Sequence, residues 1–530
     1  MWSHSLCFLF KLMVISCAII NKNSESDVNY WQNNGKTFLE NKANIKLQTQ
    51  KAKNLILFIG DGMSLTTLTA ARIYKGQLQN EPGENDHLSF ERFPFTGMSK
   101  TYCVDKQVAD SACSATAYLC GVKGNFGTIG VSSKVSRNDC PASINEEKPN
   151  SILQWAQWAG KATGIVTTTR VTHASPAGSY AHSPNRNWES DFNMQSFTEK
   201  TDTTQCEDIA SQLIKRDPGR NFNVIMGGGR SKLIMKKTNS TGERLDEDLV
   251  VRWKLDKMKR FKGKTTRYMT NRKELMSTDV SKVDYLLGLF HNTHLDYRLK
   301  SNIEMQPTLT EMTIKAIKLL QKEKNGFVLF VESGLIDIAH HNTYAKFALD
   351  ETVELSKAVS EAVALTNETE TLIVVTADHA HTLTMAGYPA RGTNILGATS
   401  WLAQDDLPYT TLSYANGPST SPSRNFFQKF NISQMVNEVH YPSFIPLDLE
   451  THGGDDVMVF AKGPWAHLFT GNYEQNIIPL AMAKAAGIST ESPYKISTSS
   501  SAFVLKVPGF KYKIVLFTLL TVARKSLMSF

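Results

Sequence analysis

Short apolar runs alternate with longer helical stretches along most of this chain. The runs are residues 55–59, 163–167, 223–226, 327–331 and 371–376, and the clearest helical stretches are 309–323 and 349–365. Runs rich in valine and isoleucine that alternate with helices are typical of a largely parallel sheet. The pattern therefore predicts an α/β fold, a three-layer sandwich with a central sheet and helices on both faces. Residues 391–450 are rich in Gly, Pro, Ser and Asn and predict a surface insertion.

Polar residues capable of chemistry follow these runs directly. Asp61 follows the first run, His173 the second, Glu332 the fourth and the pair Asp378 and His379 the fifth. In open α/β sheets, ligands bind beyond the carboxyl ends of the strands. We therefore expect these residues, although far apart in the chain, to share one pocket.

Residues 332–341 carry carboxylates and histidines after an apolar run. Asp337 and His341 are four residues apart and would share one face of a helical turn. Carboxylate and imidazole together suit zinc or magnesium. A capped helix start with surface histidines is the alternative interpretation.

Two further clusters offer the same residue types. In 376–381, Asp378 and His379 are adjacent, and His381 could orient a neighbouring ligand without binding the metal itself. In 450–456, His452 stands beside two glycines, which permit a close approach. An ordinary loop remains the alternative for the second cluster, as an ordinary turn does for Asp61.

Two segments suggest a nucleophile and an anion site. Ser111 follows Asp110 at a probable helix start, where it is either a simple N-cap or a nucleophile favoured by the helix N-terminus. Residues 168–186 add Ser175 and Arg186, and a guanidinium can hold two phosphate oxygens at once.

Composition removes several classes of protein. The chain has 530 residues, 41% hydrophobic and 20% charged, with a net charge of +8, which excludes a disordered or fibrous protein. The basic cluster 254–264 is either a solvated helix face or a nucleic-acid patch. No recognisable nucleic-acid module accompanies it, so we expect no nucleic-acid partner.

Both ends of the chain carry apolar segments. Residues 6–20 are too short to span a membrane and suit a secretory signal. Near the other end, small residues precede a spacer and the apolar tail 514–523, an order that predicts attachment of a glycosylphosphatidylinositol (GPI) anchor on Ser499, Ser500 or Ser501. An unprocessed tail is the alternative. The sequons at Asn239, Asn367 and Asn431 are compatible with secretion.

Seven cysteines are present, and Cys7 and Cys17 would leave with the signal. The odd number that remains implies at least one unpaired thiol. No Cys-x-x-Cys pair occurs, which argues against a thiolate zinc site. Parity alone suggests that Cys103 pairs with Cys113.

Six motifs in this order resemble the animal alkaline phosphatases. They are Gly-Asp-Gly-Met (60–63), Asp-Ser-Ala (110–112), Thr-Thr-Arg-Val-Thr-His-Ala-Ser-Pro-Ala-Gly (168–178), Val-Glu-Ser-Gly-Leu-Ile-Asp (331–337), Thr-Ala-Asp-His (376–379) and Glu-Thr-His-Gly-Gly-Asp-Asp-Val (450–457). The match runs from about Lys53 to Gly487. The ordered set is far more specific than any one motif.

The resemblance implies a role for each matched residue. It implies two Zn²⁺ ions and one Mg²⁺ ion, a phosphoserine intermediate on Ser111, and phosphate monoesters as substrates. The first zinc would bind Asp337, His341 and His452; the second zinc Asp61, Ser111, Asp378 and His379; the magnesium Asp61, Ser175 and Glu332. Arg186 would grip the phosphate, and His173 would support the magnesium through water.

The resemblance also implies an assembly. It predicts a homodimer on the outer face of the cell membrane, held by a GPI anchor. The expected organisation is a signal peptide (1–18), an N-terminal arm (19–52), a catalytic core (53–390 and 451–490), a crown-like insertion (391–450) and a spacer with the anchor signal (491–530). Cys140 and Cys206 match a family disulfide, and Cys120 matches a free thiol.

Some positions depart from the family pattern. Ser333, Leu335 and Ile338 replace family residues before the first zinc, and Ile338 replaces a polar side chain near the phosphate. His291 and Gln306 stand where vertebrate relatives have acidic calcium ligands, so no calcium is predicted. Two rival functions stay open: a phosphodiesterase or sulfatase with the same metal core, and an inactive, surface-anchored binding protein.

Overall fold

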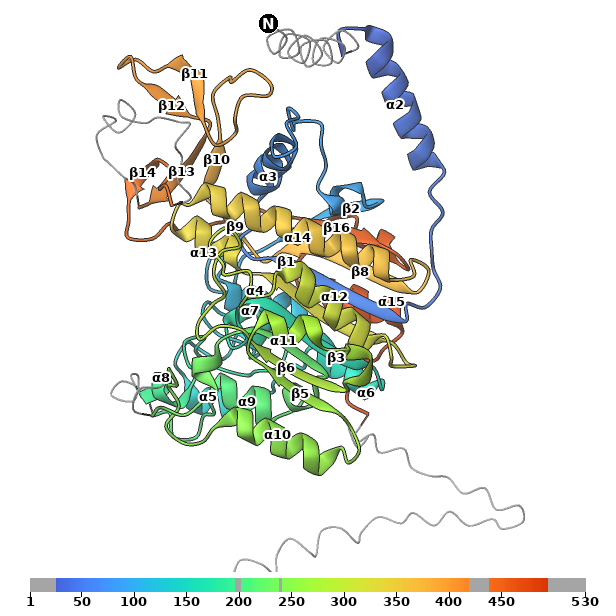
Figure 1. The fold of residues 1–530 in the computed structure, drawn as a ribbon, viewed down its shortest axis with the longest axis vertical. Coiled ribbons are helices and arrows are strands. Elements are labelled where there is room, and N and C mark those ends of the chain that lie inside the picture. The colour runs from blue at the N-terminus through green and yellow to red at the C-terminus, as the bar shows by residue number, and fades with distance from the viewer. Residues whose placement is uncertain (1–24, 196–201, 238–240, 419–437, 494–530) are drawn as a thin grey trace, which may run out of the picture. The chain divides into compact units, whose positions relative to one another are not determined.

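The computed structural model describes residues 25–195, 202–237, 241–418 and 438–493. The described residues up to Glu491 form one compact unit built around a ten-stranded sheet (Figure 1). In spatial order the strands are β17 (Gly471–Glu474), β2 (Phe95–Lys100), β16 (Val457–Lys462), β8 (Thr371–Ala377), β1 (Asn54–Gly60), β7 (Phe327–Ser333), β3 (Ala162–Arg170), β4 (Val224–Gly228), β6 (Tyr285–Leu289) and β5 (Thr266–Met269). Only β16 runs against its neighbours in this sheet. Four of the five predicted runs lie wholly within its strands, and the run 223–226 begins one residue before β4.

Helices cover both faces of the sheet, because neighbouring residues of each central strand point to opposite sides. In β1, Ile56 and Phe58 enter one apolar core while Leu55, Leu57 and Ile59 enter the other. The first core packs against α3 (Leu65–Gln77), α12 (Leu309–Leu320), α13 (Leu335–His341) and α14 (Ala345–Leu365). The second packs against α4 (Ser111–Cys120), α6 (Ile152–Trp158), α9 (Ile209–Lys215), α10 (Leu249–Arg260) and α15 (Ile477–Ala486). This is the α/β sandwich that the alternating pattern predicts.

Helix ends follow local sequence rules. Thr308 and Glu311 form a capping box at the start of α12. Gly121 takes a left-handed conformation with φ of 75° and ends α4. The predicted stretch 309–323 overshoots the end of α12 by one turn, and α14 begins four residues before the predicted 349. Shorter helices are α5 (Cys140–Asn145), α7 (Ala174–Ala177), α8 (Asp191–Gln195) and α11 (Arg272–Ser277).

The segment 391–450, which the sequence describes as irregular, contains short strands in its described part. The strands β11 (Ala398–Leu402) and β12 (Pro408–Thr410) form one small sheet. The strands β13 (Leu412–Gly417) and β14 (Ser443–Pro446) form another sheet together with β10 (Leu383–Met385), which precedes the segment. Gly, Ser and Asn hide these strands from a pattern search because they are weak strand formers.

The N-terminal helix α2 (Val28–Ala43) packs differently from the others. None of its 16 residues is buried in the described part of the chain. Val28, Trp31, Phe38 and Leu39 are 57–67% exposed. At 100° per residue these four side chains fall on one stripe of the helix.

Among the described residues, no helix is both long and apolar enough to cross a bilayer. The proposed signal peptide and the residues Ser499, Ser500 and Ser501 lie outside the described part of the chain.

Candidate metal centre

The carboxyl ends of the central strands bring the candidate residues together. Asp61 follows β1, Glu332 lies near the end of β7, and Asp378 follows β8. The strand β1 pairs in parallel with both β7 and β8, so these three residues emerge at one edge of the sheet. His452 reaches the same place through β15 (His452–Gly453), which pairs with β9 (Ala380–His381).

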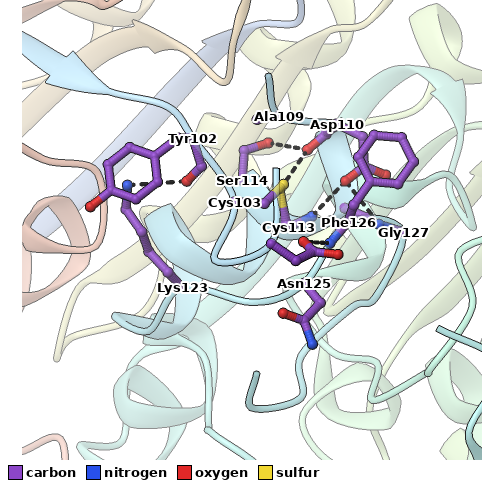
Figure 2. Close-up of a disulfide and its surroundings, with 12 residues drawn as sticks. Tyr102, Cys103, Ala109, Asp110, Cys113, Ser114, Lys123, Asn125, Phe126 and Gly127 are labelled. Atoms are coloured by element: carbon purple, nitrogen blue, oxygen red, sulfur yellow. Dashed lines mark hydrogen bonds between the residues drawn. A yellow bond between two sulfur atoms is a disulfide. The ribbon is translucent and has the colours of Figure 1, made fainter. Parts of the chain in front are cut away.

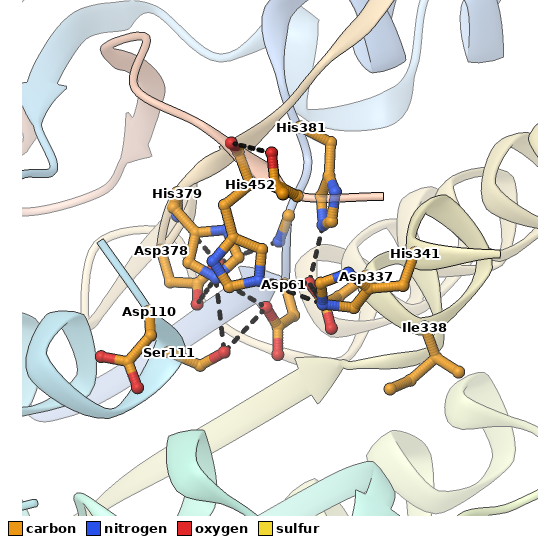
Figure 3. Close-up of polar contacts among 12 residues, drawn as sticks. Asp61, Asp110, Ser111, Asp337, Ile338, His341, Asp378, His379, His381 and His452 are labelled. Atoms are coloured by element: carbon orange, nitrogen blue, oxygen red, sulfur yellow. Dashed lines mark hydrogen bonds and ion pairs between the residues drawn. The ribbon is translucent and has the colours of Figure 1, made fainter. Parts of the chain in front are cut away.

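Three ligand atoms from Asp337, His341 and His452 face one another. The Nε2 atoms of the two histidines are 3.1 Å apart, and each lies 3.4 Å from Asp337 Oδ1 (Figure 3). Tetrahedral zinc ligands at about 2.0–2.1 Å from the metal are separated by about 3.3 Å. The spacing therefore fits a zinc ion.

The protonation of these two rings supports the same conclusion. His341 Nδ1 lies 2.6 Å from the Glu450 carbonyl, and His452 Nδ1 lies 2.7 Å from the Ala109 carbonyl. A carbonyl only accepts, so each Nδ1 carries the proton and each Nε2 presents a lone pair. Two lone pairs facing each other at 3.1 Å repel unless a cation lies between them.

His381 stands beside this group in a different state. Its Nε2 donates to Asp337 Oδ1 at 2.7 Å, and its Nδ1 donates to a carboxylate oxygen of Glu450. Burial opposes the charge, but the two carboxylates outweigh it and raise the pKa of His381 to about 10. The ring is therefore a cation that holds Asp337 in place, and Thr382 in turn donates to Glu450 through its backbone and hydroxyl.

A second group surrounds the hydroxyl of Ser111. Ser111 Oγ lies 3.3 Å from His379 Nε2 and 3.5 Å from Asp61 Oδ1. His379 Nε2 lies 3.2 Å from Asp378 Oδ2 and 3.6 Å from Asp61 Oδ1. Burial, and then the neighbouring carboxylates led by Asp378, hold the pKa of Asp61 well above its usual range. A cation bound among these buried acids would favour their ionised forms.

The third group lies on the other oxygen of Asp61. Asp61, His173 and Glu332 each offer an atom within 4.8 Å of the others, and Ser175 Oγ lies 3.4 Å from Asp61 Oδ2. Glu332 Oε2 accepts hydrogen bonds from Thr167 and Thr169, whereas its buried Oε1 has no partner among the described residues. Burial raises the pKa of Glu332 to about 7. An oxygen-rich set of this kind suits magnesium.

Asp110, rather than Ser111, is the N-cap of α4. Its Oδ1 accepts a hydrogen bond from the backbone N–H of Cys113, and its Oδ2 accepts from Arg186 Nη1 at 2.9 Å. The N-cap alternative for Ser111 is therefore wrong, and the hydroxyl is free to face Asp61 and His379. Arg186 also donates from Nη2 to His173 Nε2 at 3.2 Å, so the guanidinium is held at the centre.

Four residues of the site escaped the sequence interpretation. Glu450 holds His381, Asp110 holds Arg186, and Thr167 and Thr169 hold Glu332. The sequence could have indicated Glu450 and Asp110, because both lie within two residues of a predicted site residue. Thr167 and Thr169 could not be singled out, because threonine is a common residue inside strands.

Ile338 is half-buried and packs against the apolar core, as do Tyr297 and Tyr344. Figure 3 shows it without any polar contact to the drawn residues.

Gln306 stands at one of the two positions where the resemblance suggests that calcium ligands are lost. Its side-chain amide donates to Asp296 Oδ2 at 2.7 Å and its Oε1 accepts from the backbone N–H of Asp296 at 2.9 Å.

The described cysteines and the Asn367 sequon are placed as follows. Cys140 is joined to Cys206 and Cys103 to Cys113, while Cys120 is free. Burial raises the pKa of the Cys120 thiol to about 12. Asn367 is exposed, whereas Asn239 and Asn431 lie outside the described residues.

Comparison with known proteins bears directly on this site. The alkaline phosphatase family model matches residues 52–488. The membrane-bound alkaline phosphatase of Bombyx mori is 45% identical over 478 residues, which cover 87% of this chain and 86% of the relative. The human tissue-nonspecific isozyme is 43% identical over 518 residues, which cover 94% of this chain and 97% of that protein.

Solved structures show the same fold. The alkaline phosphatase of Thermus thermophilus aligns with a TM-score of 0.59 at 20% identity, over 84% of this chain and 94% of that one. The family is metal-dependent, in agreement with the groups of ligand atoms described above. The chain therefore belongs to the alkaline phosphatase family and is a phosphatase.

Proposed function

We propose that the protein hydrolyses phosphate monoesters through a phosphoserine intermediate on Ser111, with two zinc ions and one magnesium ion. Asp337, His341 and His452 would hold the first zinc; Asp61, Ser111, Asp378 and His379 the second; and Asp61, Ser175 and Glu332 the magnesium. The observation that carries this proposal is the cluster of carboxylate and imidazole atoms around Ser111 Oγ, together with the two facing Nε2 atoms of His341 and His452.

The proposed reaction has two steps, and Ser111 takes part in both. Ser111 Oγ attacks phosphorus in line and loses its proton, and the alcohol departs from the opposite side and takes up a proton. Water then attacks the phosphoserine, restoring the Ser111 hydroxyl and releasing inorganic phosphate. When bound, the cations neutralise the phosphate dianion and favour the ionised form of the attacking oxygen. Two in-line steps retain the configuration at phosphorus.

Other side chains keep this arrangement in place. Arg186 would bind two equatorial oxygens, and Asp110 fixes its orientation. His381 orients Asp337. The unpartnered Glu332 Oε1 and His173 Nδ1 point to a further group, which we assign to magnesium and its water.

The test removes and returns the metals. The purified protein should hydrolyse 4-nitrophenyl phosphate, lose that activity after chelation, and regain it when zinc and magnesium are added back. Methyl 4-nitrophenyl phosphate, a diester, should be a far poorer substrate. Preference for the diester would favour the phosphodiesterase rival, and the absence of hydrolysis by metal-loaded protein would favour the inactive binding protein.

We propose a GPI-anchored location on the outer face of the cell membrane. The small-residue cluster, the apolar tail and the printed name of the membrane-bound relative support this location. Phosphatidylinositol-specific phospholipase C should release the activity from intact cells. Retention of all activity on the cells would favour an unprocessed tail.

We also propose a homodimer in which the N-terminal arm contacts the partner. The exposed apolar stripe of α2 supports it, because such a stripe is normally covered. The boundaries given above for the core, the insertion and the arm remain part of this proposal.

A further inference from the structure

The disulfide between Cys103 and Cys113 encloses the start of helix α4. It closes a short covalent ring of residues 103–113, and this ring contains Ser111, the first residue of the helix (Figure 2). Both cysteines are only 2% exposed and form a small apolar cluster with Ala109, against which Phe126 packs. The bond is therefore part of the interior of the protein and not a surface link.

Three consecutive residues of this ring contact three different parts of the metal centre. The contacts are the carbonyl of Ala109 with His452 Nδ1 at 2.7 Å, the carboxylate of Asp110 with Arg186 Nη1 at 2.9 Å, and the hydroxyl of Ser111 with His379 Nε2 at 3.3 Å. They reach a proposed ligand of the first zinc, the proposed phosphate clamp and a proposed ligand of the second zinc. A shift of the ring therefore disturbs all three parts at once.

The part of the ring that precedes the nucleophile is an exposed loop. Residues 101–110, all of which the structure describes, contain no helix or strand. Val104 and Val108 are 54% and 38% exposed. Loops of this kind move more than the elements they connect unless a further bond restrains them. The disulfide supplies such a bond at the end of the loop that carries Ser111.

The bond ties the first turn of α4 to the central sheet. Cys103 follows the end of β2 by three residues, and Cys113 is the third residue of α4. The same turn holds Asp110, because the backbone N–H groups of Cys113 and Gly127 both donate to Asp110 Oδ1, at 3.2 and 3.0 Å. Any movement of this turn would carry Asp110 and Ser111 with it, and the covalent bond limits that movement.

We infer that the disulfide between Cys103 and Cys113 is a positioning element of the phosphatase reaction, which keeps Ser111 aligned with the phosphate and Asp110 against Arg186. The inference rests on the nucleophilic role proposed above for Ser111. Catalysis tolerates little misplacement, because a displacement of about 1 Å can lower a rate about a hundredfold. The bond therefore acts on the rate of the folded enzyme, in addition to its effect on stability.

The test removes the bond but keeps every backbone hydrogen bond of the ring. In the double variant Cys103→Ala with Cys113→Ala, small apolar side chains stay buried, and the N–H of residue 113 still caps α4. The control is Leu275→Ala on α11, the helix that follows the edge strand β5. Leu275 is fully buried in the first core, so its truncation lowers stability by an amount comparable to the loss of a disulfide.

Kinetics and stability are measured on the same zinc- and magnesium-saturated proteins, at a temperature at which all of them are folded. In the double variant, kcat/KM for 4-nitrophenyl phosphate should fall at least about tenfold. The inhibition constant for inorganic phosphate should rise, because Arg186 is held less firmly. The control Leu275→Ala should lower Tm and keep both constants. A bond that only stabilised the fold would give the double variant the behaviour of the control.

A second measurement uses the wild-type chain and decides the matter if the double variant does not fold. The protein is partly reduced with tris(2-carboxyethyl)phosphine, and alkylation with peptide mapping gives the fraction of each disulfide that has opened. Activity should fall with the opening of the bond between Cys103 and Cys113, and not with that between Cys140 and Cys206. Circular dichroism should stay unchanged during this loss.

The outcomes separate the two proposals. If the wild type is active and the folded double variant keeps its kinetic constants, the positioning role is wrong and the phosphatase proposal stands. The same holds if reduction abolishes activity only together with the dichroism signal. If the folded, metal-loaded wild type hydrolyses no monoester, the proposed function fails and the positioning role fails with it.

Discussion

The guanidinium of Arg186 and the carboxylate of Asp110 form an ion pair at 2.9 Å, one residue before Ser111. The same carboxylate caps α4 through the N–H of Cys113. One side chain therefore sets both the start of the helix that carries the nucleophile and the orientation of the phosphate clamp.

The variant Arg186→Lys should raise the inhibition constant for inorganic phosphate roughly tenfold or more. Lysine cannot hold two phosphate oxygens at once, and a lost hydrogen bond to a charged group is worth about 1.5–3 kcal/mol.

The control for that variant is Asp110→Asn, which keeps an N-cap residue but removes the charge that holds Arg186. It should weaken phosphate binding less than Arg186→Lys does. An inhibition constant that is unchanged in both variants would show that Arg186 does not touch phosphate.

Replacement of Ser111 by alanine should lower turnover of 4-nitrophenyl phosphate by several orders of magnitude. The hydroxyl lies between Asp61 and His379 and is the only part of the side chain that the substitution removes. The fold should survive, because Asp110 remains the helix cap. Steady-state kinetics and zinc content are the measurements, and near-normal turnover in zinc-replete Ser111→Ala protein would contradict the nucleophile assignment.

Ile338 gives a prediction about product release. Isoleucine cannot donate a hydrogen bond, so phosphate should bind more weakly here than in a variant with histidine. We expect Ile338→His to tighten inhibition by inorganic phosphate at alkaline pH with saturating zinc and magnesium. Ile338 packs against the apolar core, and an unchanged constant would mean that residue 338 does not face the phosphate.

A buried lysine makes folding depend on pH. Lys257 Nζ donates to the carbonyls of Arg220 and Phe222, and burial lowers the pKa of Lys257 to about 7. In the unfolded chain the pKa is about 10.4. Between these values the unfolded state binds more protons, so this lysine makes the folded state more stable as pH rises.

The variant Lys257→Met should remove that rise. Its Tm relative to the wild type should be highest near pH 6 and should fall steadily toward pH 10, on top of a constant loss from the missing hydrogen bonds. Lys282→Met, at a lysine whose side chain is 83% exposed, is the control and should show no such trend. A Tm difference that is independent of pH would contradict the lowered pKa.

The exposed stripe of α2 predicts the oligomeric state. Trp31→Asp with Phe38→Asp places two charges on the stripe and should shift the protein from dimer to monomer at micromolar concentration. Light scattering measures the mass, and Val251→Asp on α10 is the control for a surface charge. A wild type that is already monomeric would remove the dimer from the proposal.

Much of the fold could be predicted from the chain because the central strands are buried on both faces. Their continuous apolar runs, such as 327–331 and 371–376, are visible without any structure. The edge strands β5 and β17 and the strands of the insertion were not found, since their side chains are short, polar or half-exposed. The strand β16 was also not predicted, although Val457 to Ala461 form an apolar run, and nothing in that run indicates its antiparallel direction.

The candidate ligand residues could be predicted from the sequence, but the hydrogen bonds that hold them in place could not. Asp337, His341 and His452 could be named because they stand in unusual polar motifs. The carbonyls of Ala109 and Glu450, which fix the protons on the two rings, belong to the backbone and leave no trace in residue types. The charge on His381 likewise depends on Glu450, and that contact exists only after folding.

The position of β16 has a consequence for biosynthesis. His452 reaches Asp337 only because the chain returns, after almost its whole length, to insert β16 between β8 and β2. A nascent chain that still lacks this strand holds His341 and Asp337 but cannot complete the group around them. Under the proposed ligand assignment, a product shortened before residue 452 would lack one ligand of the first zinc, although the residues assigned to the second zinc and to the magnesium would all be present.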